Sequence, residues 1–155
     1  MLIRQAVPGD AAELVRLRAV LLRTSPRTDW NDDWREPALA SLTSRLADPG
    51  GDLGAFVADR PDGTGLASCA VGVIEHRLGD PHNPSGRFGY VFNVATDPDM
   101  RRQGLSRACV TALIAWFRDR GIGGVDLMAS PDGESLYLSL GFARKKDPAM
   151  RLRLP

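Results

Sequence analysis

The chain lacks any excess of charge, since 20 Lys and Arg residues face 19 Asp and Glu residues and leave a formal net charge of +1. So small a charge provides no strong field for nucleic acid or for an anionic membrane surface. An uninterrupted apolar run of about 18 residues, which a membrane-spanning helix requires, is also missing. The first residues lack the basic and apolar regions of a signal peptide. We therefore expect a cytoplasmic protein with neither a nucleic-acid nor a membrane partner.

Cysteine and histidine are scarce, with two residues of each. The sequence offers no support for a disulfide between Cys69 and Cys109, and we expect two buried, reduced thiols. His76 and His82 are too few and too scattered to form a metal cluster. No metal site is therefore predicted.

The composition is that of an ordinary soluble domain, with 43% hydrophobic and 25% charged residues. A length of 155 residues fits one domain with a substantial core. Neither an internal repeat nor a low-complexity linker interrupts the chain. We expect a single domain over residues 1–155.

Apolar periodicity and turn residues divide the chain into helices and strands. Strands are predicted at 2–7, 53–59, 66–77, 88–96 and 125–129, with one or two closing strands within 142–154. Helices are predicted from a capping-box-like start at Asp10 and Glu13, and at about 36–46, 104–120 and 132–140. This order predicts an α/β fold whose mixed, mostly antiparallel sheet is flanked by helices on both faces. The unit 88–129 should be a parallel crossover.

The most informative segment joins the strand at 88–96 to the helix at 104–120. A helix start offers unpaired N–H groups and the positive end of a dipole, which suit a phosphate group. Arg101 and Arg102 can neutralise its charge, and Gly104 permits close backbone approach. The same residues also fit an ordinary strand–helix connection with solvated arginines. The segment is neither a P-loop nor a dinucleotide fingerprint.

This segment, with the downstream Leu136-Tyr137-Leu138-Ser139-Leu140-Gly141-Phe142, resembles the GCN5-related N-acetyltransferases. In that family an Arg/Gln-x-x-Gly-x-Gly/Ala turn holds the pyrophosphate of acetyl-CoA. Here Ser106 replaces the final Gly/Ala. The resemblance covers 88–142 by motif and 1–87 by element order. It implies the acyl-CoA N-acyltransferase fold, acetyl-CoA as cosubstrate, and a phosphate-binding turn made of Arg101, Arg102, Gln103, Gly104, Leu105 and Ser106.

The resemblance also implies roles for the strand before the turn and for two residues after the helix. Val94, Ala95 and Thr96 should lie beside the pantetheine arm, with an N–H group near Val94 polarising the thioester carbonyl. Tyr137 matches a tyrosine that protonates the leaving thiolate. It could instead be a core aromatic. Ser130 stands where many relatives carry an Asn that bonds pantetheine, and a helix cap is its other interpretation.

The acceptor side is less determined. Asn93 either points into the acceptor pocket or makes a structural contact at a bulge, because a buried amide needs partners. Trp30 and Trp34 either cover that pocket or pack under the loop that carries them. Glu75 and Asp33 are candidate general bases, although each is also typical of a solvated surface carboxylate. A chain of waters could carry the proton in their place.

The resemblance implies an enzyme that transfers an acetyl group from acetyl-CoA to a primary amine by direct attack in a ternary complex. The acceptor stays open among small molecules and peptide amines. The alternative from another class is a non-catalytic acyl-CoA sensor or interaction module. A second copy of the chain remains a candidate partner.

Overall fold

A computed structural model describes residues 2–25 and 29–155. Its sheet contains β1 (Ile3–Gln5), β2 (Leu53–Asp59), β3 (Leu66–His76), β4 (Arg87–Thr96) and β5 (Val125–Leu127), which lie side by side in chain order. The first four strands are antiparallel neighbours, and β5 runs parallel to β4. The predicted fold class, with its mixed, mostly antiparallel sheet, is confirmed.

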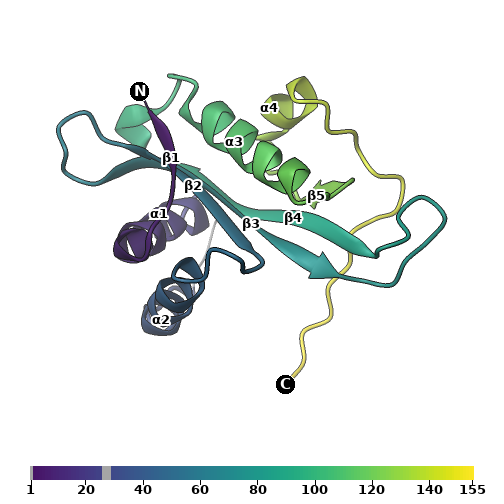
Figure 1. Cartoon of the computed structure of the whole chain (residues 1–155). Helices are drawn as coiled ribbons and strands as arrows, with labels where there is room; N and C mark the ends of the chain where they lie inside the picture. The colour runs from purple at the N-terminus through teal and green to yellow at the C-terminus, as the bar shows by residue number, and fades with distance from the viewer. Residues whose placement is uncertain (1, 26–28) are drawn as a thin grey trace.

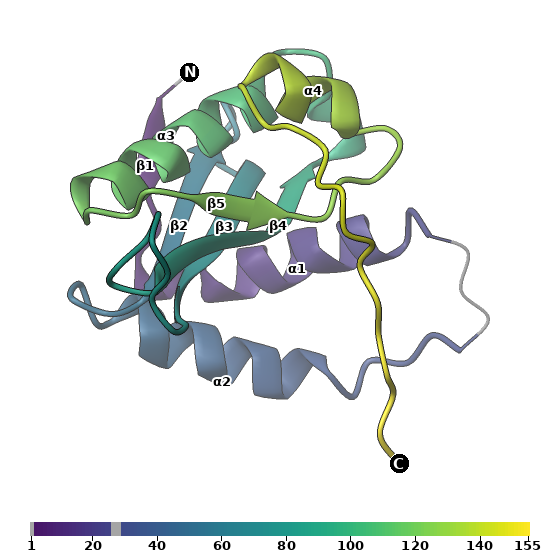
Figure 2. The ribbon, with the colours of Figure 1, turned by 90° about the vertical axis from the view of Figure 1, so that its right-hand side faces the viewer.

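Helices cover both faces of the sheet (Figures 1 and 2). α1 (Ala11–Leu22) and α2 (Arg35–Leu46) lie against one face, whereas α3 (Leu105–Asp119) and the short α4 (Glu134–Ser139) lie on the other. Two 3-10 turns, η1 (Pro8–Asp10) and η2 (Pro98–Met100), precede α1 and the turn before α3. No helix in residues 2–25 and 29–155 is long and apolar enough to cross a bilayer.

A separate apolar layer fills each side of the sheet. Leu113 and Phe117 of α3 are fully buried in the layer that contains Val91 of β4. Leu14 and Leu17 of α1 are buried in the layer that contains Val71 of β3. Burying a side chain of this size contributes about 1.5–3 kcal/mol. The long helices are therefore firm supports for the strand ends that they flank.

The sheet contains a bulge next to its most polar buried residue. Val71 pairs with Asn93, whereas the next residue of β3, Gly72, pairs with Val91. Phe92 is thus the extra residue of β4, and this residue is 37% exposed. Such a bulge bends a strand and changes where the following side chains point.

Two local predictions were wrong. Residues 142–155 contain no strand, and Met150, Leu152 and Leu154 are exposed. Instead of pairing with β5, residues 142–148 cross outside it, from the α4 side towards the α1 and α2 side (Figure 2).

The predicted capping box at Asp10 and Glu13 is absent, because both carboxylates have stronger partners. Asp10 accepts a 2.8 Å bond from Arg4 and another 2.8 Å bond from the Val7 N–H. Glu13 accepts bonds from Arg16 and from the Leu66 N–H. A guanidinium gives a charge-assisted bond, which is stronger than a neutral cap.

The packing of α3 on β2 depends on a glycine. A Cβ atom added at Gly54 would lie 2.7 Å from the indole ring of Trp116. We expect Gly54→Ala to lower the free energy of unfolding by about 1–3 kcal/mol, because the ring must shift. At Gly123 an added Cβ meets no atom within 4 Å. Gly123→Ala is the matched control and should be neutral or slightly stabilising. Urea denaturation of both variants measures the difference, and equal midpoints would contradict this account.

Candidate active site

The site is built where β4 and β5 stop being neighbours. β5 pairs with Gly89, Tyr90 and Val91 of β4 and with no later residue of that strand. β4 nevertheless continues to Thr96, paired with β3 alone. The second half of β4, residues 93–96, therefore has one edge without a strand partner among the described residues. An extended ligand can pair with such an edge through backbone groups.

The turn after β4 leads directly into α3. Gly104 is the residue before the helix and has a φ of 74°, and an added Cβ there meets no atom within 4 Å. The first bond of the helix runs from the Ala108 N–H to the Gly104 carbonyl over 3.0 Å. By helix geometry the N–H groups of Leu105, Ser106 and Arg107 are left without intrahelical acceptors. The turn is therefore an open cradle of N–H donors at the positive end of α3.

Arg102 is held in an unusual conformation within this cradle. It is the one non-glycine residue among those described with a positive φ, 62°. The left-handed region costs about 1–2 kcal/mol for a residue with a Cβ atom. Strain of this kind gathers at functional segments. Arg101, one residue earlier, reaches back to the Thr96 carbonyl over 3.4 Å.

A chain of hydroxyl groups ties the turn to two strands. Ser106 Oγ lies 2.6 Å from Thr96 Oγ1, which lies 2.7 Å from Ser68 Oγ. Ser68 in turn donates to the Ala95 carbonyl over 3.1 Å. The replacement of the family's Gly/Ala by Ser106 thus adds a link between α3 and β4. The sequence motif marked this replacement, but the partner became visible only in the fold.

Asp97, which directly precedes η2, was missed by sequence reasoning. Its carboxylate is buried and accepts hydrogen bonds from Arg16 of α1 and Arg60 just after β2. No local pattern could reveal this cluster, because the arginines lie 81 and 37 residues away in the sequence. The hydrogen bond from Arg16 also holds the pKa of Glu13 below its ordinary value.

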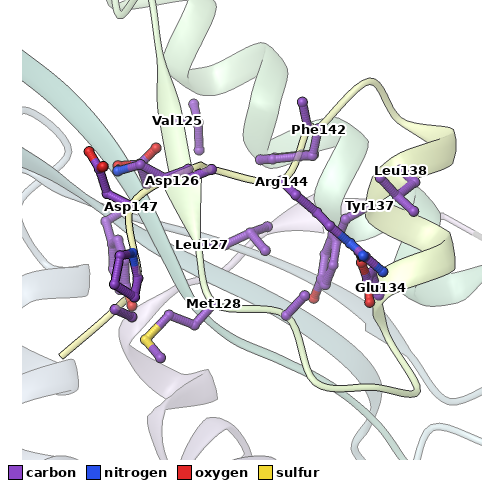
Figure 3. Close-up of a pocket in the computed structure, with 16 residues that line it drawn as sticks. Val125, Asp126, Leu127, Met128, Glu134, Tyr137, Leu138, Phe142, Arg144 and Asp147 are labelled. Carbon is purple, nitrogen blue, oxygen red and sulfur yellow. Dashed lines mark hydrogen bonds and ion pairs between the residues drawn. The ribbon is translucent and has the colours of Figure 1, made fainter. Parts of the chain in front are cut away.

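Tyr137 lies on α4 at the margin of the α3 core. Its half-buried ring packs edge-to-face on Phe142, with ring centroids 5.8 Å apart. It lines a groove of about 650 Å³, together with Leu127, Met128 and Glu134 (Figure 3). Burial raises the pKa of the Tyr137 phenol. The group therefore keeps its proton through neutral pH, as a general acid must.

Ser130 lies in the turn before α4, and it is not the helix cap that the sequence allowed, because the N-cap residue is Gly133 and no side chain caps it. The Ser130 hydroxyl oxygen accepts the Gly133 N–H over 3.2 Å, and the Ser130 carbonyl accepts the Glu134 N–H over 3.1 Å. These bonds shape the turn before α4.

Asn93 faces α1, on the opposite side of the sheet from the core against which Tyr137 packs. Its Oδ1 accepts a 3.1 Å bond from Arg18, and its Nδ2 lies 3.7 Å from the buried Cys69 sulfur. Asn93 itself is only 3% exposed. The amide thus has the structural partners expected beside a bulge. No hydrogen bond joins it to Tyr137 within the described part of the chain.

Arg18 also lines a second cavity, of about 300 Å³, together with Leu22, Asp29, Trp30, Asn31 and Trp34. The two indole rings meet edge-to-face with centroids 6.0 Å apart. Both tryptophans therefore line a hollow that is linked through Arg18 to Asn93 of β4. Residues 26–28, in the same connection, lie outside the described residues.

The two candidate bases lie elsewhere. Glu75 pairs with Phe88 near the start of β4 and accepts a 2.9 Å bond from Arg77. Asp33 is exposed, and its N–H donates to Asn31. Neither carboxylate lines the groove beside Tyr137 or the cavity beside Trp30 and Trp34.

The model of the acetyltransferase (GNAT) family matches residues 19–142. The chain belongs to this family. The predicted family is thereby confirmed, and the predicted enzyme class, an acetyltransferase, is that of the family.

Two curated acetyltransferases are similar to this chain in sequence. A mycothiol acetyltransferase of Rhodococcus jostii (strain RHA1) is 32% identical, over 87% of this chain and 43% of its own length. An aminoglycoside N(6')-acetyltransferase type 1 of Stenotrophomonas maltophilia is 34% identical, over 77% of this chain and 69% of its own. The chain therefore spans less than half of the mycothiol enzyme.

Solved structures agree in fold. A predicted acetyltransferase with acetyl-CoA from Clostridium acetobutylicum superposes with a TM-score of 0.83 at 22% identity, over 98% of this chain and 95% of that one. A GCN5-related N-acetyltransferase from Ralstonia eutropha JMP134 gives 0.82 at 22% identity, over 97% of each chain. At this identity the match establishes the fold alone.

The hydroxyl chain yields a stability test. Thr96→Val keeps the side-chain shape but removes the central hydroxyl, which leaves the buried Ser68 and the partly buried Ser106 short of a partner. We expect a loss of about 1–2 kcal/mol in the free energy of unfolding. Thr43→Val is the control, because the Thr43 hydroxyl bonds the Leu39 carbonyl on the exposed side of α2. Equal losses in the two variants, measured by chemical denaturation, would remove the hydroxyl chain as a stabilising contact.

Proposed function

We propose that residues 1–155 form one N-acetyltransferase domain that transfers an acetyl group from acetyl-CoA to a primary amine by direct attack in a ternary complex. The observation that carries the proposal is the open cradle at Gly104, placed at the end of the unpaired half of β4. Family membership supports acetyl-CoA as the cosubstrate.

The residues of the turn fit a pyrophosphate. The N–H groups of the segment from Gln103 to Arg107 would donate to its oxygens, and Arg101 and Arg102 would balance its charge. The open space at Gly104 leaves room for a phosphate close to the backbone. The backbone of Val94, Ala95 and Thr96 would hold the pantetheine arm as a neighbouring strand would. In this proposal Ser130 adds at most one hydroxyl contact.

At the reacting end, the chain would position the thioester, donate a hydrogen bond to its oxygen and give a proton to the leaving thiolate. An N–H group near Val94 would donate to the thioester oxygen as it gains negative charge. Tyr137 would give its proton to the departing thiolate. The attacking amine must be neutral, although a free alkyl ammonium has a pKa of roughly 10. Because neither Glu75 nor Asp33 lines either cavity, we assign removal of the amine proton to water.

The acceptor would enter from the second cavity, which Trp30 and Trp34 line and which we call the tryptophan cavity. Arg18 lines this cavity and bonds Asn93, so the hollow lies on the α1 side of the same strand that would hold pantetheine. Asp29 would attract an amine to this cavity, whereas Arg23 and Arg35 already lie over the Trp30 and Trp34 rings, 4.6 and 5.3 Å from the ring centroids. Relatives are named for the small molecules mycothiol and aminoglycoside. We therefore place a small-molecule amine first and a peptide amine second. A cytoplasmic location stays a prediction.

The cofactor site is tested by Gly104→Glu, which brings bulk and negative charge to the proposed phosphate site. We expect acetyl-CoA affinity in calorimetry to fall at least about tenfold, or 1.4 kcal/mol. Gly121→Glu is the matched control, because Gly121 has the same left-handed conformation, with φ 77° and open space, at the other end of α3. Loss of affinity in both variants, or in neither, would show that the phosphates bind elsewhere.

The catalytic role is tested by Tyr137→Phe in a CoA-release assay over a panel of amines. The change keeps the ring and removes the proton, so kcat should fall about a hundredfold, at the lower end for general acids, with acetyl-CoA affinity unchanged. The kcat that depends on Tyr137 should decline only at pH values above its raised pKa, where the phenol ionises. A kcat within twofold of the parent would assign Tyr137 to packing alone. Acetyl-CoA binding without CoA release for any amine would favour the sensor alternative.

A further inference from the structure

We infer that Asp97, held by Arg16 and Arg60, is a positioning residue that sets the phosphate turn against α1 and thereby controls acetyl-CoA affinity. The inference rests on the proposed function of the turn and goes beyond it, because none of these three residues would touch acetyl-CoA. Asp97 directly follows β4, and three residues of η2 separate it from Arg101. Any movement at Asp97 is therefore passed directly to the N–H groups of the cradle.

The backbone N–H, the carbonyl and the carboxylate of Asp97 all form hydrogen bonds that fix this residue in place. Its N–H donates to the Ala67 carbonyl over 2.8 Å, and its carbonyl accepts the Met100 N–H over 2.9 Å. Its two carboxylate oxygens accept from Arg16 Nη1 and Nη2 over 2.7 and 2.9 Å. Arg60 Nη1 adds a third bond of 2.8 Å to the same carboxylate.

The arginines are anchored in turn. Arg16 donates to Glu13 over 2.7 Å and to the Leu66 carbonyl over 3.0 Å. Arg60 also pairs with Asp99 inside η2. The Asp97 side chain is only 8% exposed, whereas those of Arg16 and Arg60 are 39% and 19% exposed, so the carboxylate is the shielded partner of these bonds. The result is a clamp of two forks that joins α1, the β2–β3 connection and the start of the turn.

The clamp also links the two sides of the proposed reaction. Arg18, two residues after Arg16 on α1, lines the tryptophan cavity and bonds Asn93. One helix therefore holds the cofactor turn through Arg16 and the acceptor hollow through Arg18.

The chain contains a matched pair for control. Asp10 is also a poorly exposed carboxylate, 12%, held by the fork of Arg4 over 2.8 and 2.9 Å. Arg4 also bonds a second carboxylate, Asp59, as Arg60 bonds Asp99. Asp10 directly precedes α1, and none of its hydrogen bonds within the described residues reaches the turn before α3. The Asp97 and Asp10 clusters thus share the same carboxylate–guanidinium chemistry. They differ in location, because Asp97 leads into the turn before α3 and Asp10 leads into α1.

The experiment compares Asp97→Asn with Asp10→Asn. We expect both to lower the thermal midpoint by similar amounts, because each removes the charge from a carboxylate–guanidinium fork. Acetyl-CoA and CoA affinities in calorimetry should fall at least fivefold in Asp97→Asn and stay within twofold of the parent in Asp10→Asn. The KM for acetyl-CoA should rise accordingly in Asp97→Asn, with kcat at saturating acetyl-CoA changed less than about twofold. Asp97→Glu, which keeps the charge, should recover part of the affinity.

Arg60→Gln and Arg4→Gln repeat the comparison with the other partner of each clamp, should Asp97→Asn fail to fold. A loss of affinity in Arg60→Gln that Arg4→Gln does not share supports the inference. Equal acetyl-CoA affinities in the paired variants would overturn it, as would a loss that simply follows the thermal midpoint in both. If the parent chain itself bound no acetyl-CoA, the proposed function would fail instead, so the two failures are distinguishable.

Discussion

The early end of the β4–β5 ladder is the constraint on which the candidate site depends. Three residues of β4 have β5 as a neighbour, and the strand then continues with β3 alone. Backbone groups at a sheet edge carry a cost unless water or a ligand satisfies them. Here that edge leads directly into the turn at Arg101–Ser106, so that one continuous stretch of chain offers first a strand edge and then a helix N-terminus.

An open edge and an open turn need rigid support from elsewhere, because neither contributes packing of its own. The apolar layers fix α1 and α3 on opposite faces of the sheet. Polar links then connect the turn to these layers: the hydroxyl chain through Thr96 on one side, and the Asp97 clamp on the other. The site is thus pre-formed by contacts that lie beside it rather than within it. This arrangement leaves the N–H donors of the turn available for the phosphate oxygens of the proposed cosubstrate.

The separation of Asn93 and Tyr137 to opposite sides of the sheet clarifies their roles. Tyr137 packs with the α3 layer, whereas Asn93 is bonded to α1 and to Cys69. The bulge at Phe92 accounts for the orientation, since an extra residue changes the alternation of the strand. Asn93 therefore has structural partners beside the bulge and is connected through Arg18 to the cavity that Trp30 and Trp34 line. Tyr137 remains the catalytic candidate, with a phenol that burial keeps protonated.

Local patterns in the sequence were sufficient for most elements. Apolar periodicity placed α2 and α3 to within one residue at each end, and β2 at its observed bounds, because each buries a face that matches its period. The turn proposed to bind phosphate could be located because a basic, glycine-containing segment between a strand and a helix is itself a local feature. The closing strands within 142–154 were not decided locally: the alternation at Met150, Leu152 and Leu154 has a strand's period, but a strand also needs a partner at the right register.

What the sequence by itself determined is therefore the family, the order of the elements and the location of the turn. Only the tertiary structure decided the partners of charged and hydroxyl groups. Asp97 and Arg16 lie 81 residues apart, and Ser68 and Thr96 lie 28 apart. Folding brings such groups together through the packing of apolar faces that contain none of them. For that reason no pattern along the chain reveals the clamp that holds the turn in place.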